Sequence, residues 1–457
     1  MTRGGLVRIV CVGGGPAGLY FAISAKRRDA GHEITIIDRD PPGATYGWGV
    51  VYWDNLLDVL FRNDPDSARE IRGASTLWQE QDISLGGERA AHFAGYGFSV
   101  QRAALLDILT RRAEELGVRV EHDREVADLT DLADLGCLGG LGAHADADLV
   151  IAADGANSQV RSMFADRFGT RVDTGGNRYI WLGTPRRFER FTFAFEPTPA
   201  GWVWFHAYPS GAEVSTCIVE CAPRTWDALG LGTDDGEGLR LLGKIFAGPL
   251  AGEGLIDQLR RPARWQRFGQ VSNRSWYWDN MVLLGDAAHT THFTLGSGTA
   301  LAMMDGVMLA QMLYEHGEVP VALAEFDRAG RAALAPLQAR ARTSMAWFER
   351  IDGQLDRARP ATGGDPDPVT FAYAMATRQG DQPPWRYQAH RAMQVGAVRR
   401  LRREVDSSVR WYLARRRGEP ARPGGRPAPA GTPTPAGAAG RALAGAGSGS
   451  AVHRSHG

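Results

Sequence analysis

The sequence predicts an α/β fold in which a Rossmann-like parallel sheet is interrupted by an inserted antiparallel sheet and followed by C-terminal helices. Three observations predict it. The chain opens with a strand, a glycine-rich turn, a helix and a second strand over residues 6–38. Short segments of alternating apolar and aromatic residues then fill the stretch 175–270. From Met281 the pattern of a buried parallel strand returns.

The first motif is the glycine turn at residues 13–18, which reads Gly-Gly-Gly-Pro-Ala-Gly and directly follows the β-branched run Leu6–Val12. In such a turn the first glycine permits the tight bend, the second lets a pyrophosphate reach the backbone, and the third lets helix pack on strand. The second strand, Glu33–Ile37, ends at Asp38, which lies 20 residues after Gly18, the spacing of a ribose-binding carboxylate. The helix start offers its N–H groups to phosphate. An acid at this position favours FAD or NAD over NADP, and a glycine turn without a ligand is the alternative.

Composition sets outer limits on the function. The 457 residues include 44% hydrophobic and 23% charged residues, and the formal net charge is zero, as in globular enzymes of two or three structural units. A neutral chain gives no electrostatic reason to expect nucleic acid or a membrane as partner, and no apolar run approaches the ~20 residues of a membrane span. We expect no signal peptide, no metal site, reduced thiols at all four cysteines and a cytoplasmic location.

Two later strand ends carry acidic residues. One buried strand ends at Asp154 and Gly155, and another ends at Gly285 and Asp286. Because ligands of open parallel sheets bind at the carboxyl ends of the strands, both acids are candidates for one cofactor site. A helix predicted from Thr299 to about residue 314 follows the second acid, so another helix N-terminus is directed at a ligand.

The intervening segments predict the rest of the architecture. Antiparallel strands are expected at 179–182, 191–195, 202–208 and 214–220, forming the ceiling of a pocket at a domain boundary. Residues 39–52 are expected to be an irregular, glycine-rich loop, either an ordinary turn or backbone that approaches a flat ligand. Helical periodicity marks 101–116, 319–350 and 393–417, whereas 352–384 shows no clear pattern.

The glycine turn, Asp154-Gly155 and Gly285-Asp286 stand in one order, and this order resembles the single-component (class A) flavin-dependent aromatic hydroxylases, the para-hydroxybenzoate hydroxylase-like group. The resemblance spans about residues 7–349. A closer likeness to salicylyl-CoA 5-hydroxylase and the N-terminal part of anthraniloyl-CoA monooxygenase rests on residues 46–51, 178–183, 191–195, 206–208, 285–298 and 371–373. Residues 291–294 replace a proline-rich turn usual in the wider family, and the CoA-ester group shares that change.

The resemblance implies bound FAD, transient NADH or NADPH, and O2, with hydroxylation through a flavin hydroperoxide. The implied substrate is an aromatic acyl-CoA thioester, and the implied reaction converts salicylyl-CoA to gentisyl-CoA. The enzyme is also a candidate homodimer. Alternatives are 4-hydroxybenzoyl-CoA, anthraniloyl-CoA, a free phenolic acid or a biosynthetic intermediate. A flavin halogenase shares the fold, but residues 201–207 break its Gly-Trp-x-Trp-x-Ile-Pro signature and residues 50–61 lack lysine. A non-enzymatic flavin-fold protein is disfavoured because all three motifs are present.

The implied domains are an FAD-binding domain in two parts, an inserted substrate-binding sheet, a helical extension and a tail. Their expected bounds are 1–172 and 273–350 for the FAD-binding domain with its long helix, 173–272 for the sheet, 351–417 for the extension, and 418–457 for a disordered Pro/Ala/Gly tail.

The implied site residues fall into three groups. The cofactor-binding group is Gly13, Gly15, Pro16, Ala17, Gly18, Asp38, Arg39, Gly47, Trp48, Gly49, Arg102, Asp154, Gly155, Gly285, Asp286, Gly296, Ser297 and Gly298. The candidates for a catalytic base are His206, Tyr208, His289 and His292, each with a structural role as the alternative. The pocket-lining group is Trp181, Phe193, Phe195, Trp204 and Phe293, with core packing as the alternative. Arg186, Arg187 and Arg190 are candidate partners of a CoA phosphate, although lysine is so rare here that arginine clusters carry little weight.

Overall fold

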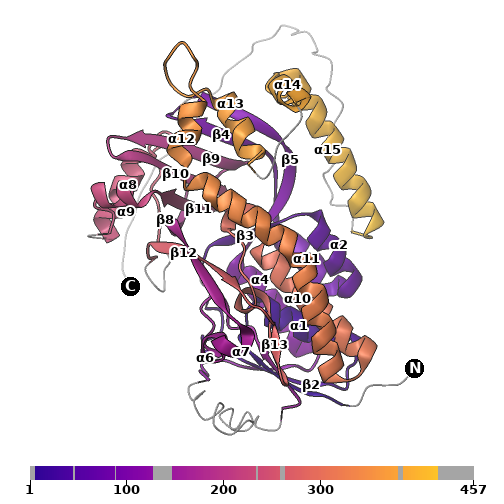
Figure 1. Cartoon of the computed structure of the whole chain (residues 1–457). Coiled ribbons are helices and arrows are strands. Elements are labelled where there is room, and N and C mark those ends of the chain that lie inside the picture. The colour runs from indigo at the N-terminus through magenta and orange to yellow at the C-terminus, as the bar shows by residue number, and fades with distance from the viewer. Residues whose placement is uncertain are drawn as a thin grey trace, which may run out of the picture.

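The computed structural model describes residues 6–44, 47–87, 89–126, 147–232, 235–257, 263–378 and 384–419. Within this part of the chain, two sheets are stacked end to end and helices cover both (Figure 1). The α/β class predicted from the sequence is confirmed. Tyr46, Cys137 and the predicted tail from residue 420 onward lie outside the described residues.

The first sheet is the nucleotide-binding sheet that the glycine turn predicts. Its strand order is β13-β14-β7-β1-β2-β6, and all neighbours except β13 and β14 are parallel. The strands are β1 (Arg8–Val12), β2 (Glu33–Ile37), β6 (Arg119–Glu121), β7 (Leu149–Ala152), β13 (Tyr277–Trp278) and β14 (Met281–Leu283). β1, β7 and β14 are buried along almost their whole length, as strands covered on both faces must be.

Helices α1 (Pro16–Arg28) and α10 (Gly298–His316) pack against each other beside this sheet with their backbones in contact. A Cβ at Gly306 would lie 2.7 Å from the backbone nitrogen of Phe21, so glycine is required at the crossing. At the helix starts, a Cβ at Gly285 would lie 2.8 Å from the Cβ of Ala17 and 3.1 Å from that of Ala302. The packing therefore brings the N-termini of α1 and α10 to the same place.

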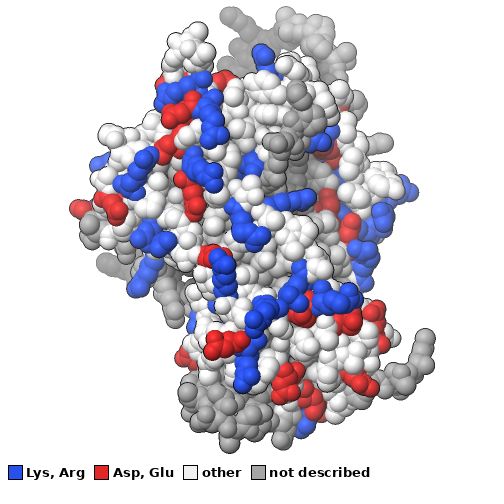
Figure 2. Space-filling model, in the orientation of Figure 1, with Lys and Arg blue, Asp and Glu red and all other residues white. Residues whose placement is uncertain are grey.

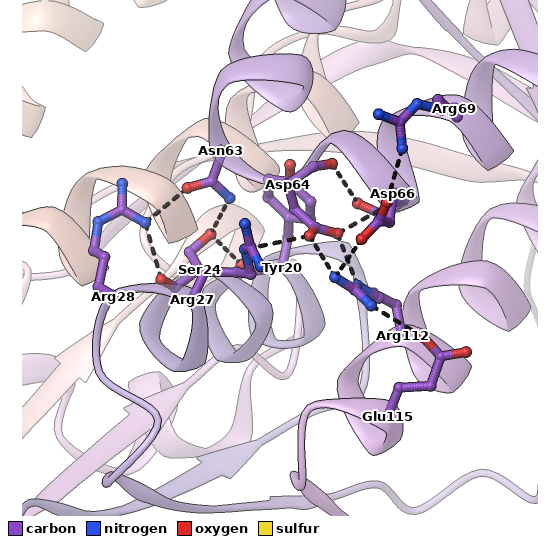
Figure 3. Close-up of polar contacts among 11 residues, drawn as sticks. Tyr20, Ser24, Arg27, Arg28, Asn63, Asp64, Asp66, Arg69, Arg112 and Glu115 are labelled. Atoms are coloured by element: carbon purple, nitrogen blue, oxygen red, sulfur yellow. Dashed lines mark hydrogen bonds and ion pairs between the residues drawn. The ribbon is translucent and has the colours of Figure 1, made fainter.

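A polar network anchors α1 to α2 (Asp54–Asn63), α3 (Pro65–Ala74) and α4 (Arg102–Glu115) (Figure 3). Asp64 caps α3 by accepting from the Ser67 backbone and also receives two hydrogen bonds from Arg112. Burial alone would raise the pKa of Asp64, but these donors outweigh it and lower the pKa. The network fixes the helix whose first turn carries the glycine motif.

The second sheet has the order β12-β8-β11-β10-β9-β4-β5-β3, and most of its neighbours are antiparallel. Its strands are β3 (Gly49–Tyr52), β4 (Thr76–Leu85), β5 (Arg89–Gln101), β8 (Arg171–Thr184), β9 (Phe191–Thr198), β10 (Gly201–Pro209), β11 (Ser215–Cys221) and β12 (Gln266–Ser272). The predicted strands of the stretch 175–270 are present, and α8 (Pro223–Ala228) and α9 (Asp235–Ile245) follow β11.

Four strands of this sheet, β3, β4, β5 and β12, were not predicted. The expectation of an irregular loop over residues 39–52 is wrong from Gly49 onward, because that segment is an edge strand paired with β5. β4 and β5 carry the sheet toward the N-terminal part of the chain, and β4 pairs in parallel with β9. The domain bounds remain a prediction, although the sheet draws on residues well before position 173.

The C-terminal helices lie across both sheets. The long α11 (Val319–Phe348) runs diagonally from the second sheet to α10, and α12 (Ile351–Arg357) and α13 (Pro368–Ala376) cover the second sheet (Figure 1). The segment 352–384, which showed no pattern, contains α12 and α13. The start of α13 has a local signal, since Asp367 accepts from the Thr370 backbone at 2.8 Å and Pro368 follows it.

The last helix, α15 (Gly396–Arg416), follows α14 (Pro384–Ala392) and lies along β5 with its polar side inward (Figure 1). Buried Glu80 receives two hydrogen bonds from Arg399 at 3.2 Å and lies within 3.6 Å of Arg403. The opposite side of the helix is exposed and mixes charged residues with large apolar ones. Its exposed large apolar residues are Val398, Leu401, Val405, Val409, Trp411 and Tyr412.

The surface and the helices give two further observations. On the face shown in Figure 2, Lys and Arg side chains are interspersed with Asp and Glu. No helix within the described ranges combines the length and the apolar character that crossing a bilayer requires. In the same ranges no group of His, Cys, Asp and Glu side chains is arranged as a metal site.

Candidate cofactor and substrate site

The glycine turn is held between β2 and β7. Gly13 has φ +109°, its N–H donates to Ile37 O at 2.8 Å, and a Cβ there would lie 2.4 Å from Ala153 O. A Cβ at Gly18 would lie 2.4 Å from Gly13 O. The fold itself therefore requires glycine at both positions.

Gly15 differs from these two, because no protein atom requires a glycine there. Its backbone is extended, with φ −77° and ψ 178°, and the nearest atom to a Cβ would be Ala153 O at 4.0 Å. Gly15 is also the N-cap of α1, has no side chain to cap the helix, and is followed by Pro16 and Ala17. The free N–H groups of the first turn and the open space in front of Gly15 suit a phosphate group that approaches the backbone.

Asp38 holds the turn as well as ending β2. Its Oδ2 accepts from the Gly14 backbone at 2.6 Å, and its Oδ1 accepts from the Asp40 backbone at 2.8 Å. A carboxylate has about four lone-pair directions, so a ribose hydroxyl can still donate to this half-buried group. The predicted Arg39 is exposed beside it.

The two acidic corners lie side by side in the structure. Asp154 accepts from the Gln159 backbone at 2.8 Å through Oδ2, while its buried Oδ1 has no partner among the described residues. Arg161 joins the corners, since its guanidinium donates to Ala156 O at 2.6 Å and to Ala287 O at 3.1 Å. Sequence reasoning missed Arg161, whose only signal is its place seven residues after Asp154.

Asp286 lies at the start of α10, and a Cβ at Gly298 would be 4.0 Å from its Oδ1. Burial among protein atoms raises the pKa of Asp286, yet the residue remains open to solvent on one side. Burial lowers the pKa of nearby Arg102, and its Nε has no partner within the described chain. Ser297 precedes α10 without capping it by its side chain.

These observations fit an extended dinucleotide such as FAD. Two uncapped helix N-termini meet at one place, and open space faces Gly15 and Gly155. An unpartnered acceptor on Asp154 and an unpartnered donor on Arg102 lie in the same region. Phosphates, ribityl hydroxyls and a polar ring edge would satisfy groups of these kinds.

The segment Gly47–Gly49 connects the cofactor region to the second sheet. The ring of Trp48 packs on Gly183, where a Cβ would lie 2.8 Å from it, and a Cβ at Gly47 would lie 3.1 Å from the Trp181 ring. The indole N–H groups of Trp48 and Trp181 are buried without a partner in the described structure. Both therefore can donate to a ligand at this boundary.

Gly49 is required by packing, because a Cβ there would lie 2.4 Å from the Cβ of Ser210. The buried Tyr208 hydroxyl donates to Gly49 O at 2.8 Å, so its role in the structure is to hold β3. Gly296 is packed as tightly, since a Cβ there would lie 2.7 Å from Val51.

Beyond Trp181, aromatic rings cover the face of the second sheet. The half-buried members are Tyr179, Trp181, Phe191 and Phe293. His206 lies among them, with its ring centroid 5.6 Å from those of Phe193 and Phe293. No described residue is hydrogen-bonded to the imidazole of His206, whose backbone pairs within the sheet. This surface is the structure's candidate for binding a flat ring.

His206 and His292 share one environment. Burial, together with the nearby charge of Arg378, lowers the pKa of each to about 3, so both imidazoles are neutral at working pH. His289 differs, because it forms a buried ion pair with Asp305 at 2.8 Å. Burial opposes its charge, but Asp305 outweighs burial and raises the pKa of His289. This placement favours a structural role for His289, and a catalytic role for any of the four candidates stays a prediction.

Phe195 and Trp204 are 0% and 1% exposed. They pack on Phe371 and Phe348 of the C-terminal helices, with centroids 4.9 Å and 6.2 Å apart respectively. Their placement favours core packing, and their substrate role remains a prediction. Of the arginines considered for a CoA phosphate, Arg190 is already paired with Glu80 and Asp82.

Glu220 is a buried acid on this face that sequence reasoning missed. Its oxygens accept from Asn177 at 2.7 Å and from Trp204 at 3.2 Å. Burial raises the pKa of Glu220 to about 7 despite these donors. A small cavity behind the sheet, lined by Ile180, Leu239 and Trp265 among others, lies on the opposite side of β8 and contains no predicted site residue.

Glu220→Gln is expected to flatten the dependence of stability on pH. Because the folded state raises the pKa of Glu220 from its ordinary 4.5 to about 7, its contribution is complete below pH 4.5 and is lost as pH rises through 7. The loss is of the order of 3 kcal/mol. Denaturant titrations between pH 4 and 8 measure it, with exposed Glu253→Gln as the matched control. Parallel wild-type and E220Q profiles would contradict the raised pKa.

No protein-family model matches the sequence. The chain is 34% identical over 383 residues to a salicyloyl-CoA 5-hydroxylase of a Streptomyces species, covering 81% of this chain and 70% of that protein. It is 38% identical over 345 residues to a 3-hydroxy-4-methyl-anthranilyl-[aryl-carrier protein] 5-monooxygenase of Streptosporangium sibiricum, covering 76% and 90%. The solved structure of the tetrameric form of 2-methyl-3-hydroxypyridine-5-carboxylic acid oxygenase superposes with a TM-score of 0.59 at 21% identity, over 77% of this chain and 92% of that one.

The fold and the cofactor region are those of a dinucleotide-binding protein whose site fits FAD. The identity and coverage of these relatives show that the chain belongs to the family of FAD-dependent aromatic monooxygenases.

Proposed function

We propose that the chain hydroxylates the ring of an aromatic acyl group carried as a thioester, with salicylyl-CoA as the first candidate substrate and NADH or NADPH as transient reductant. The observation that carries the proposal is the half-buried aromatic surface around His206, which adjoins the cofactor region through Trp48 and Phe293. Two relatives support the thioester. One is named for a CoA ester and the other for an acyl group on an aryl-carrier protein.

An aryl-carrier protein, in place of CoA, is the second candidate for the group that carries the aromatic acyl thioester. The relative named for it has the higher identity, 38% against 34%, and this chain covers 90% of it. In addition, Arg190 is held by two carboxylates and is less available to a CoA phosphate. A substrate that is bound mainly through its ring would serve either carrier.

When bound, FAD supplies the chemistry that uses the reductant and O2 to insert one oxygen atom into the ring. The glycine turn and the start of α1 would hold its pyrophosphate, Asp38 its ribose hydroxyls, and Asp154 and Asp286 its ribityl hydroxyls. Trp181 and Phe293 would orient the substrate ring and exclude water from it. The neutral imidazole of His206 can exchange a proton with a ring substituent.

The test is to follow NADH and NADPH oxidation and product mass with salicylyl-CoA, 4-hydroxybenzoyl-CoA, anthraniloyl-CoA, carrier-bound salicylyl and free salicylate side by side. We expect a thioester to stimulate oxidation at least tenfold over free salicylate and to gain one oxygen atom. Asp286→Ala should lose FAD and this activity, whereas exposed Asp279→Asn should keep both. Stimulation by free salicylate alone would overturn the thioester assignment.

A further inference from the structure

Arg378 is a half-buried cation with no carboxylate partner among the described residues. Its Nε donates to Ser344 Oγ at 2.7 Å, one terminal nitrogen donates to Met375 O at 2.7 Å, and the other donates to Thr294 O at 3.2 Å. All three acceptors are neutral, and no described carboxylate lies within ion-pair distance. Burial lowers the pKa of Arg378 to about 10. The residue lies two positions after the end of α13, in a segment whose sequence showed no pattern.

Several other enclosed arginines in the described ranges are matched by acids, although Arg161 donates only to backbone carbonyls. Arg417 contacts Asp54 and Asp58, and Arg112 contacts Asp64. An unmatched buried charge costs several kcal/mol unless something compensates it. The ring of Phe348, whose centroid lies 5.6 Å from the Arg378 guanidinium carbon, compensates part of this charge, and the remainder suits an anion brought by a ligand.

A hydrogen-bond chain links Arg378 to His292. Ser344 Oγ lies 2.9 Å from Thr294 Oγ1, which lies 2.8 Å from His292 Nδ1. Because the arginine can only donate, Ser344 Oγ accepts its hydrogen bond. The Ser344 hydroxyl can then donate to Thr294 Oγ1, and the Thr294 hydroxyl can donate to His292 Nδ1. In this arrangement both hydroxyl groups donate a hydrogen bond, and the proton of the neutral His292 imidazole is on Nε2. His292 then presents an N–H donor at its free side.

Arg378, the charged end of this hydrogen-bond chain, lies near the aromatic surface around His206. Arg378 lowers the pKa of both His206 and His292 in addition to burial. Both imidazole rings contact Phe293, with centroids 5.6 Å and 4.2 Å away. The surface thus combines aromatic rings, two neutral imidazoles and one positive charge that no described carboxylate pairs.

We propose that Arg378, with the His292 N–H that its hydrogen-bond chain orients, is the counter-charge for an anionic oxygen on the bound aromatic ring. The inference rests on the proposed function, because a thioester has no free carboxylate and its ring can be anionic only as a phenolate. A phenolate oxygen gives more electron density to the ring than a phenol does, so it favours attack by an electrophilic oxygen. Arg378 then acts as a specificity residue for ionised hydroxyaromatic rings.

Other titratable groups face this surface and enter the design of the test. They are Tyr179 on β8, His206 on β10, Glu220 on β11, Asp286 before α10, and Glu349 after α11. Burial raises the pKa of Tyr179 to about 12, and both histidines stay neutral above pH 5, so Glu220 is the neighbour expected to titrate near neutrality. The experiment therefore uses an E220Q background alongside the wild type.

The probe is 4-nitrophenol, whose phenol and phenolate absorb at different wavelengths. Its apparent pKa is measured when bound to the holoenzyme, in wild type, Arg378→Gln, Arg378→Lys and exposed Arg391→Gln, each with and without Glu220→Gln. We expect binding to wild type and R391Q to lower the probe's pKa by at least one unit, R378K to keep most of the shift, and R378Q to abolish it. Neutral 4-nitroanisole should bind all four equally. An unchanged shift in R378Q would overturn the proposal, and an equal loss of both probes would show a merely structural role.

Two further arms complete the test. If R378Q does not fold, Ser344→Ala keeps the arginine but breaks the chain to His292, and we expect it to lose part of the shift. If 4-nitrobenzoate depends on Arg378 and 4-nitrophenol does not, the anion is a carboxylate and the phenolate assignment is wrong. No probe is a thioester, so failure of the thioester assignment and failure of this proposal are separate results.

Discussion

Gly15→Ala is expected to weaken FAD binding about tenfold or more while the apoprotein keeps its stability. The added methyl group meets no protein atom within 4 Å apart from Ala153 O at that distance, and the backbone there is extended. It would instead occupy the space through which a pyrophosphate reaches the first turn of α1. Loss of one charge-assisted hydrogen bond is worth about 1.5–3 kcal/mol, and 1.4 kcal/mol is a factor of ten. Calorimetric titration of apoprotein with FAD and thermal unfolding of the apoprotein measure the two effects.

Two other glycine variants complete this comparison. Gly13→Ala should destabilise even the apoprotein, because its φ of +109° and the 2.4 Å approach to Ala153 O leave no room for a Cβ. Gly243→Ala in α9 has open space around it and should leave FAD affinity unchanged while raising apoprotein stability by about 0.5–1 kcal/mol. Undiminished FAD affinity in G15A would contradict the pyrophosphate site at this turn.

Glu80→Gln is expected to lower the free energy of unfolding by roughly 2–4 kcal/mol and to loosen α15. Glu80 is 3% exposed, and its carboxylate lies within 3.6 Å of Arg190, Arg399 and Arg403. The neutral amide would leave these arginines facing one another without their shared acid. Since α15 is docked through its polar side, little apolar burial holds it in place.

Hydrogen exchange localises this effect. Amide protons of α15 should exchange faster in E80Q than in wild type, while those of α1 and α10 should change far less. Glu404→Gln, on the exposed side of α15, is the matched control and should leave both stability and exchange unaltered. Unchanged protection of α15 in E80Q would show that the helix is held by other contacts.

Local sequence patterns predicted the cofactor half of the molecule well. The run from β1 through the glycine turn to Asp38 forms over neighbouring residues, and the conformational demands on Gly13 and Gly18 are visible in the residue types themselves. Strand-end acids such as Asp154 and Asp286 could be placed as well, because parallel topology brings the carboxyl ends of strands to one edge. The role of each residue toward FAD remains a prediction.

The ring-binding half was predicted less well, because its parts are joined only by long-range pairing. β4 and β5 were missed, and β3 was taken for a loop, since an edge strand of four residues has no periodicity of its own. Arg161, Glu220 and Arg378 were missed for a related reason: nothing beside them in the chain marks them as partners of the site.

The sequence alone determined that a parallel sheet would present a glycine turn and two acidic corners to a dinucleotide, because those requirements are local and follow from backbone sterics and strand order. Only the tertiary structure decided which aromatic and charged side chains surround His206, because β10, α11 and the residue after α13 are distant in the chain. It also decided which charges stay unmatched, since Arg190 found Glu80 while Arg378 found only neutral oxygens. Burial and pairing of charges are properties of packing, and no run of neighbouring residues encodes them.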